Sequence, residues 1–230
     1  MLFAISDLHL SFTGEKPMRV FGDKWNNHTD KLLKNWKMTV GPDDAVIISG
    51  DISWAKKLQN AAADLDYIKN LPGTKICMPG NHDYWWSSAS KLRDLYPDPG
   101  MVFLRYDHIG YGDHAVCAVR GWLCPGDHNF DPISDAKIYE RELTRLETTL
   151  DAAKKAGYKK MILAAHFPPA GESFKHAGFF NVIKRYPVEK IIFGHLHGAK
   201  TERRKSFMLN NIECFLVSCD FLDFTPVRIL

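Results

Sequence analysis

The sequence lacks the features that mark membrane-spanning, disulfide-stabilised and nucleic-acid-binding proteins. No apolar stretch approaches the roughly 20 residues that a helix needs to cross a bilayer. The five cysteines are an odd number without a C-x-x-C pair, which fits a reducing compartment better than a disulfide framework. The net charge is only +3, and the nearest approach to a basic block is the short run 203–205. We therefore expect no membrane partner, and the charge pattern argues against a nucleic-acid partner.

Low-complexity segments and internal repeats are also missing, and the composition is that of an ordinary globular protein. Hydrophobic residues make up 45% of the chain and charged residues 25%. The 230 residues are enough for one large domain with a buried core, so we expect a single domain over residues 1–230. About five mostly apolar residues precede Ser6, too few for the apolar core of a signal peptide, and the expected location is the cytoplasm.

Short apolar runs recur along the chain, and each one breaks abruptly into polar residues. Continuous apolar runs of this length are typical of strands that are covered on both faces. Between these runs, the segments 58–71 and 135–157 have apolar residues at helical spacing. This alternation predicts an α/β domain, in which the Gly- and Pro-rich segment 105–132 is a strand-and-loop insertion. The runs are 2–5, 45–48, 75–78, 161–165, 190–193 and 215–217.

The polar residues that follow these runs form the candidate site. Singly, each has an ordinary explanation as a turn residue or a structural histidine. Because ligands in α/β folds gather beyond the carboxyl ends of the strands, we expect these side chains to lie together. So many titratable groups in one place would be costly to desolvate without a metal, whereas two divalent cations would satisfy them. The candidate metal ligands are Asp7, His9, Asp51, Asn81, His166, His195 and His197, and His82 accompanies them.

Local spacing supports this interpretation. Asp7 and His9 are two residues apart, as are His195 and His197, so extended backbone would direct each pair to one side. Glycines at positions 50, 80 and 194 would let the chain turn sharply and let an ion or phosphate approach the backbone.

The order of the blocks D-x-H, G-D, G-N-H-D, H and G-H-x-H, over residues 7–197, resembles the calcineurin-like metallophosphoesterase superfamily. The resemblance implies a two-sheet sandwich flanked by helices. It also implies direct attack on phosphorus by a hydroxide that bridges two metals, with His82 as the general acid. Manganese, iron and zinc all suit such mixed nitrogen and oxygen ligands. The implied ligands are Asp7, His9, Asp51 and His197 for one metal and Asp51, Asn81, His166 and His195 for the other, with Asp51 bridging.

The expected activity is hydrolysis of a small phosphomonoester or phosphodiester. After Asp51 the chain lacks the Asp-Arg-Gly of protein Ser/Thr phosphatases, which argues against a phosphoprotein substrate. One alternative is a binding or scaffold member of the same fold, although such members have degraded ligands. Another is a nuclease, which would need a long basic groove that the sequence does not show.

Several residues near the motifs have two interpretations. Trp54 is the preferred candidate for a substrate pocket, whereas the aromatic residues 84–86 fit core positions better. Trp122 and His128 would face the substrate if 105–132 were a lid. Asp83 is a candidate to orient the His82 ring. The remaining histidines, His28, His108, His114 and His176, are predicted surface or helix residues.

Overall fold

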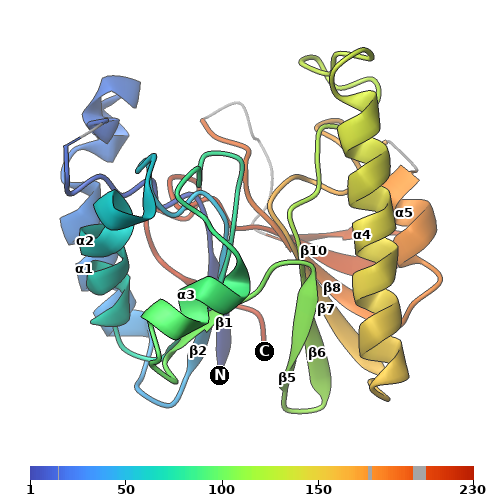
Figure 1. Cartoon of the computed structure of the whole chain (residues 1–230), viewed down its shortest axis with the longest axis horizontal. Coiled ribbons are helices and arrows are strands. Elements are labelled where there is room, and N and C mark those ends of the chain that lie inside the picture. Colours follow the sequence, from blue (N-terminus) through green and yellow to red (C-terminus); the bar gives the residue numbers. More distant parts are fainter. Residues whose placement is uncertain (15, 176–177, 199–205) are drawn as a thin grey trace.

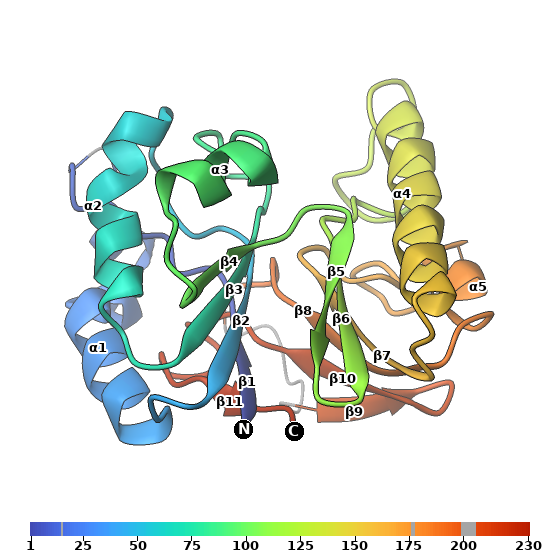
Figure 2. The same cartoon turned by 60° about the horizontal axis from the view of Figure 1, so that its bottom comes forward.

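Two β-sheets lie against each other at the centre of the protein, with helices on their outer faces (Figures 1 and 2), in a computed structural model that describes residues 1–14, 16–175, 178–198 and 206–230. The first sheet has the strand order β11-β1-β2-β3-β4, with β11 antiparallel to β1 and the others parallel. Its strands are β1 (Leu2–Ile5), β2 (Ala45–Ser49), β3 (Thr74–Met78), β4 (Met101–Phe103) and β11 (Val227–Arg228).

The second sheet has the order β5-β6-β7-β8-β10-β9, with four parallel central strands and an antiparallel strand at each edge. Its strands are β5 (Asp107–Tyr111), β6 (His114–Val119), β7 (Lys160–Ala165), β8 (Val188–Phe193), β9 (Ser206–Leu209) and β10 (Ile212–Leu216). The helices are α1 (His28–Thr39), α2 (Leu58–Lys69), α3 (Ala89–Leu95), α4 (Ala136–Lys155) and α5 (Gly178–Ile183), with 3-10 turns η1 (Met18–Phe21) and η2 (Asp23–Trp25).

Burial on both faces explains why the strands are continuous apolar runs. Every residue of β2 is buried, since one face of the strand meets the other sheet and the other face meets helices. Helix α4 covers the second sheet with an apolar stripe that includes Leu146 and Leu150. Each fully buried Leu or Ile side chain contributes roughly 1.5–3 kcal/mol. The predicted α/β class and two-sheet sandwich are confirmed.

The predicted segment boundaries agree with the structure except in the region 105–132. The predicted helices 58–71 and 135–157 are α2 and α4, and the six apolar runs fall in strands. Within 105–132, however, β5 and β6 belong to the second sheet, where β6 pairs in parallel with β7 (Figure 2). The description as an insertion therefore fits only the loop after β6. The edge strand β5 resembles a loop in sequence because its residues are exposed or half-buried and include Gly110.

The two sheets meet where their parallel strands end. The Ser6 backbone N–H, just after β1, donates to the carbonyl of Val217, just after β10, at 2.8 Å, and Cys219 N–H donates back to Ser6 at 2.9 Å. The loops that follow β1, β2, β3, β7 and β8 therefore come together at one edge. Across the described ranges, no helix has both the length and the apolar character required to span a membrane.

Candidate metal centre

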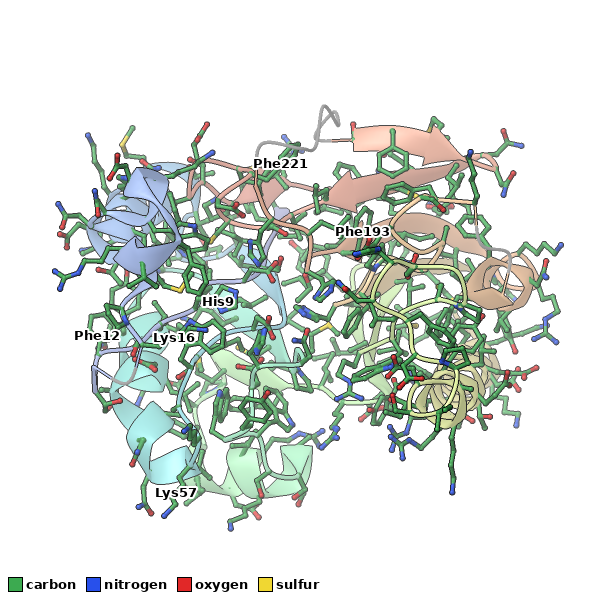
Figure 3. All side chains as sticks on the ribbon, turned by 90° about the horizontal axis from the view of Figure 1, so that it is seen from above. His9, Phe12, Lys16, Lys57, Phe193 and Phe221 are labelled. Atoms are coloured by element: carbon green, nitrogen blue, oxygen red, sulfur yellow. The ribbon has the colours of Figure 1, made fainter. Side chains whose placement is uncertain are left out.

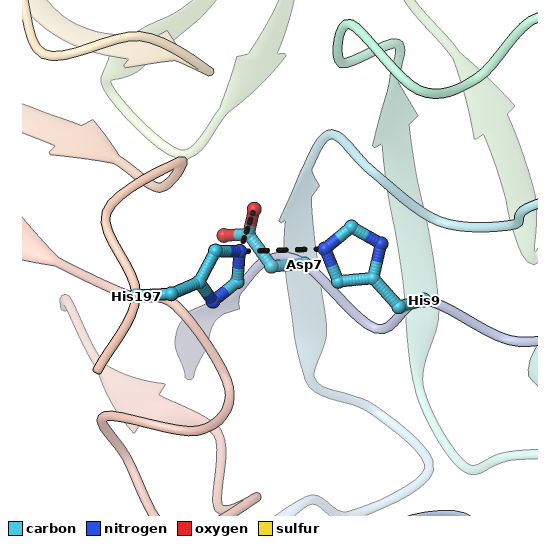
Figure 4. A group of neighbouring side chains, drawn as sticks. All are labelled: Asp7, His9 and His197. Atoms are coloured by element: carbon cyan, nitrogen blue, oxygen red, sulfur yellow. Dashed lines mark hydrogen bonds and ion pairs between the residues drawn. The ribbon is translucent and has the colours of Figure 1, made fainter. Parts of the chain in front are cut away.

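Four predicted ligands form one group at this edge. His9 Nε2 lies 3.3 Å from His197 Nε2 and 3.9 Å from Asp51 Oδ2. His197 Nε2 lies 3.4 Å from Asp7 Oδ1 (Figure 4). The ligand atoms of Asp7, His9 and His197 thus all lie within 4.8 Å of one another, and Asp51 borders this group through His9.

The other predicted ligands form a second group that shares Asp51. Asn81 Oδ1 lies 2.8 Å from His166 Nε2 and 3.2 Å from His195 Nδ1. His166 Nε2 in turn lies 3.4 Å from Asp51 Oδ2. One carboxylate oxygen of Asp51 therefore lies within 3.9 Å of a histidine nitrogen in each group.

Left-handed backbone brings these side chains together. Asp7, His9, Asp51 and His195 have φ values of 58°, 47°, 51° and 68°, where a residue other than glycine costs on the order of 1–3 kcal/mol. The prediction that extended backbone aligns Asp7 with His9 is therefore wrong, since the chain turns at each residue. Hydrogen bonds hold the turns: Asp7 N–H donates to Gly50 O at 2.9 Å, and His9 N–H to Asp51 O at 3.0 Å. Such strain is concentrated where function requires it.

All three predicted glycines are required by close approach. A Cβ on Gly50 would lie 2.5 Å from His166 Nδ1 and 2.8 Å from the Gly80 backbone. A Cβ on Gly80 would collide with the carboxylate and backbone nitrogen of Asp51, and one on Gly194 would collide with Asp7 and Ser6. The ligand carboxylates therefore pass directly over bare backbone, and the glycines leave room for them.

Hydrogen bonds fix which nitrogen of two imidazoles faces the site. His166 Nδ1 lies 3.0 Å from the Ser49 carbonyl, and His197 Nδ1 lies 2.9 Å from Asp220 Oδ1. Both partners accept, so each Nδ1 donates, and each Nε2 is the nitrogen that faces the site and would bind a metal ion once deprotonated. Asp220 was missed by the sequence interpretation, although it follows the run 215–217 as the other site residues follow theirs.

The charges of the site fit bound cations. Burial raises the pKa of Asp7, but His197, His166 and His9 outweigh it, and the pKa lies well below its usual range. Burial lowers the pKa of His166 and His197, yet the neighbouring carboxylates raise the values to about 9 and 10. The two buried carboxylates thus hold protons on two histidines where metal ions would supply the positive charge.

The donor atoms also have the right chemistry and spacing. Bonds of 2.0–2.2 Å place neighbouring ligand atoms roughly 3.0–3.5 Å apart, close to most separations in both groups. Mixed carboxylate, amide and imidazole ligands suit divalent transition metals. The residues therefore fit two ions.

His82 lies beside the ligands, with its ring 4.4 Å from Trp54 and 5.9 Å from His9. Its backbone N–H donates to Asp51 Oδ1 at 2.8 Å. Asp83 does not orient the ring. Its carboxylate accepts four other hydrogen bonds of 2.8–3.0 Å, from the backbone N–H groups of residues 52, 53 and 80 and from Trp85 Nε1. Asp83 therefore holds the loop that presents His82.

A cavity of about 370 Å³ opens beside the site, and Trp54 lines it together with His9, His82 and His197. Tyr84 is exposed, whereas Trp85 and Trp86 are buried in the core. Neither Trp122 nor His128 is among the described residues that line this cavity. Trp122 instead packs on Phe167, whose ring lies 4.1 Å from His195.

Among the histidines outside the motifs, His114 does not have the predicted surface or helix position. His114 is buried, not on the surface, and its Nδ1 lies 2.7 Å from Asp113. Its place in β6 explains the burial, since this strand lies inside the second sheet. His176 and the basic run 203–205 lie outside the described residues.

Comparison with known proteins gives matches over most of the chain. The family model described as calcineurin-like phosphoesterase matches residues 2–199. The Gene 66 protein of Mycobacterium phage L5 is 33% identical over 135 residues, 54% of this chain and 63% of that protein. The [acyl-carrier-protein] phosphodiesterase PptH of Mycobacterium tuberculosis is 29% identical over 110 residues, 47% of this chain and 26% of that protein.

Among solved structures, phosphopantetheinyl hydrolase (PptH) from Mycobacterium tuberculosis aligns with a TM-score of 0.52 and 19% identity, covering 94% of this chain and 88% of that one. At this identity the likeness concerns the fold alone. The chain spans less than two thirds of the length of both curated relatives that it matches.

Proposed function

Since the chain belongs to the calcineurin-like phosphoesterase family, we propose that it hydrolyses phosphoric esters at a centre of two divalent metal ions. The observation that carries the proposal is the convergence of seven candidate ligand side chains in two groups, which Asp51 connects through its contacts with His9 and His166. Asp7 also lies close to both groups, since its carboxylate is near His9 and His197 and also near Asp51 and His166. One group consists of Asp7, His9, His197 and Asp51, and the other of Asn81, His166, His195 and Asp51.

The bound ions would polarise the phosphoryl oxygens and lower the pKa of a water molecule so that it attacks near neutral pH. The chain's own residues hold and orient the site. Ser49 and Asp220 fix the ring orientations of His166 and His197, and the strained turns direct the carboxylates inward. Manganese, iron and zinc each satisfy this ligand set.

His82 is the proposed general acid. An alkoxide leaves slowly unless it is protonated, and His82 lines the cavity where a leaving group would lie. Burial lowers the pKa of its imidazole, partly opposed by Asp51, which makes the protonated form a stronger acid and shifts its population to lower pH. Such proton transfer contributes about 10²–10⁴-fold to the rate.

The proposed substrate is small, and a phosphodiester is favoured over a phosphomonoester. The name of the relative PptH describes a phosphodiesterase, and the 370 Å³ cavity leaves room for an organic group next to the phosphate. A phosphomonoester is the second candidate, because the ligand set alone does not discriminate between them.

The test is reconstitution. Protein stripped of metal is loaded with manganese, iron or zinc, its metal content is measured, and hydrolysis of matched alkyl phosphomonoesters and phosphodiesters is followed. We expect two ions per chain and hydrolysis only in the loaded protein. A chain that binds two ions and cleaves none of these esters would be the binding member of the fold. A chain that binds no ion would contradict the proposal.

A further inference from the structure

The cavity beside the metal centre has two unlike walls. One wall consists of His9, His82 and His197, which face the proposed metals. The other wall is apolar and comes from the segment between β1 and α1, where Met18 and Trp25 are buried and Phe21 is half exposed. At about 370 Å³ the cavity matches sites for small organic molecules and exceeds what a phosphoryl group alone requires.

One cation, Lys16, lies within this apolar wall. Its Nζ atom is 3.7 Å from the centre of the Trp54 ring and 4.8 Å from that of Phe21. Within the described residues, these rings and not a carboxylate are the partners of the ammonium group. Contact with aromatic faces holds a lysine in place, yet an ammonium group has three N–H donors and keeps donors free for an anion.

The Trp54 ring that carries Lys16 is itself fixed. Its Nε1–H donates to Met18 Sδ at 3.0 Å, and its ring stacks on His9 with centroids 4.7 Å apart and 15° between the planes. Trp54 therefore links the ammonium group to a proposed metal ligand, and Figure 3 shows Lys16 and His9 in the same part of the molecule. The ammonium group is therefore held on the Trp54 ring, whose other neighbours, His9 and His82, belong to the centre where phosphate would bind.

We propose that this cavity binds the organic part of the substrate and that Lys16 binds a second anionic group on it. The substrate class is a phosphoric ester whose alcohol part is largely apolar and ends in a carboxylate or a second phosphate. This inference rests on the proposed function, because it assumes that the scissile phosphate lies at the metals. The apolar wall would bury the organic body, while Lys16 selects its charged end.

Binding of non-hydrolysable probes tests the subsite independently of turnover. Calorimetry on the metal-loaded protein compares hexylphosphonate with the matched compounds that end in a carboxylate or a second phosphonate. A charge-assisted hydrogen bond predicts about ten- to hundredfold tighter binding of at least one of the two charged-end probes than of hexylphosphonate. The affinities of the two charged-end probes show whether the site prefers a carboxylate or a second phosphate.

Three variants identify the cation. Lys16→Met should reduce the affinity ratio between charged-end and hexyl probes to about one, and Lys16→Arg should retain most of it. Lys24→Met removes an exposed lysine of the same segment that pairs with Asp223, and it should leave the ratio unchanged. Equal binding of all probes by the wild-type protein would overturn the inference, as would a ratio that Lys16→Met and Lys24→Met reduce equally.

The esters that correspond to these probes separate the two proposals. Hydrolysis without any preference for a charged end would leave the proposed function standing and remove the subsite. Selective binding of charged-end phosphonates without hydrolysis of any ester would do the reverse.

Discussion

Asp220→Ala should weaken one metal position and spare the other. Asp220 is buried, and its Oδ1 accepts from His197 Nδ1 at 2.9 Å while Oδ2 accepts from Gly198 N–H at 3.1 Å. Without this partner the His197 ring rotates freely and its Nε2 loses basicity. Removal of such a partner typically costs 10–100-fold in metal affinity, or about 1.4–2.8 kcal/mol. His166 should keep its geometry, because its orienting partner is the Ser49 carbonyl.

Calorimetric titration of metal-stripped protein with manganese or zinc measures both affinities. We expect one affinity to fall by the stated factor and the other to stay within about threefold. Asp223→Ala is the matched control, since Asp223 is an exposed acid nearby whose ion pair with Lys24 contributes little. Two unchanged affinities would refute the role of Asp220, and so would an equal fall of both in a variant of unaltered stability.

Three further predictions concern catalysis, stability and pH. His82→Ala should lose about 10²–10⁴-fold in rate on an alkyl ester but far less on a nitrophenyl ester, because a nitrophenolate leaves without being protonated. Equal losses on both esters, with both metals bound, would show that His82 stabilises the charge of the phosphate instead. Lys75→Met should lower the free energy of unfolding by about 1–3 kcal/mol in chemical denaturation, because the buried ammonium group donates to three backbone carbonyls near the end of α2 at 2.6–3.1 Å. Lys69→Met, at an exposed position, is the control, and equal effects of the two substitutions would contradict this reasoning. Burial lowers the pKa of His166 and His197, but neighbouring carboxylates raise the values to about 9 and about 10, so the stabilising effect of the two protonated rings in metal-free protein is complete below pH 6.5 and lost as the pH rises through 9 and 10. Denaturation should show a decrease of at least about 3 kcal/mol over this range, absent once metal replaces the protons, and a flat profile without metal would refute the assignment.

The strands were predictable because burial on both faces leaves a strong local signal. The run 45–48 is all apolar and β2 is buried at every residue. Helix α1 gave no such signal, since Leu32 and Trp36 are its only fully buried residues and lysines cover much of the rest. The edge strand β5 was hidden for the same reason, because its residues are exposed or half-buried and include Gly110. Elements with little burial cannot be told from loops by apolar pattern.

The convergence of the candidate ligands was predictable from their positions after strand ends, whereas their local geometry was not. Residues after strand ends were expected to converge, and the structure brings them together. The left-handed turns at Asp7 and His9 depend on hydrogen bonds to the loop after β2, so no local rule predicts them. Asp220 and Lys16 join the site only through tertiary packing: one follows the last strand of the second sheet, and the other rests on Trp54.

Metal binding by Asp51→Asn tests the central claim most directly. Asp51 Oδ2 lies between the two ligand groups, 3.4 Å from His166 Nε2 and 3.9 Å from His9 Nε2, and a neutral amide bridges two cations poorly. Metal content and affinity are measured on stripped and reloaded protein, with exposed Asp43→Asn as the control for charge and circular dichroism as the check on folding. We predict two ions per chain in the wild-type and control proteins and weakened binding of both ions in the folded Asp51→Asn variant. Two ions bound to that variant at wild-type affinity would contradict the shared centre.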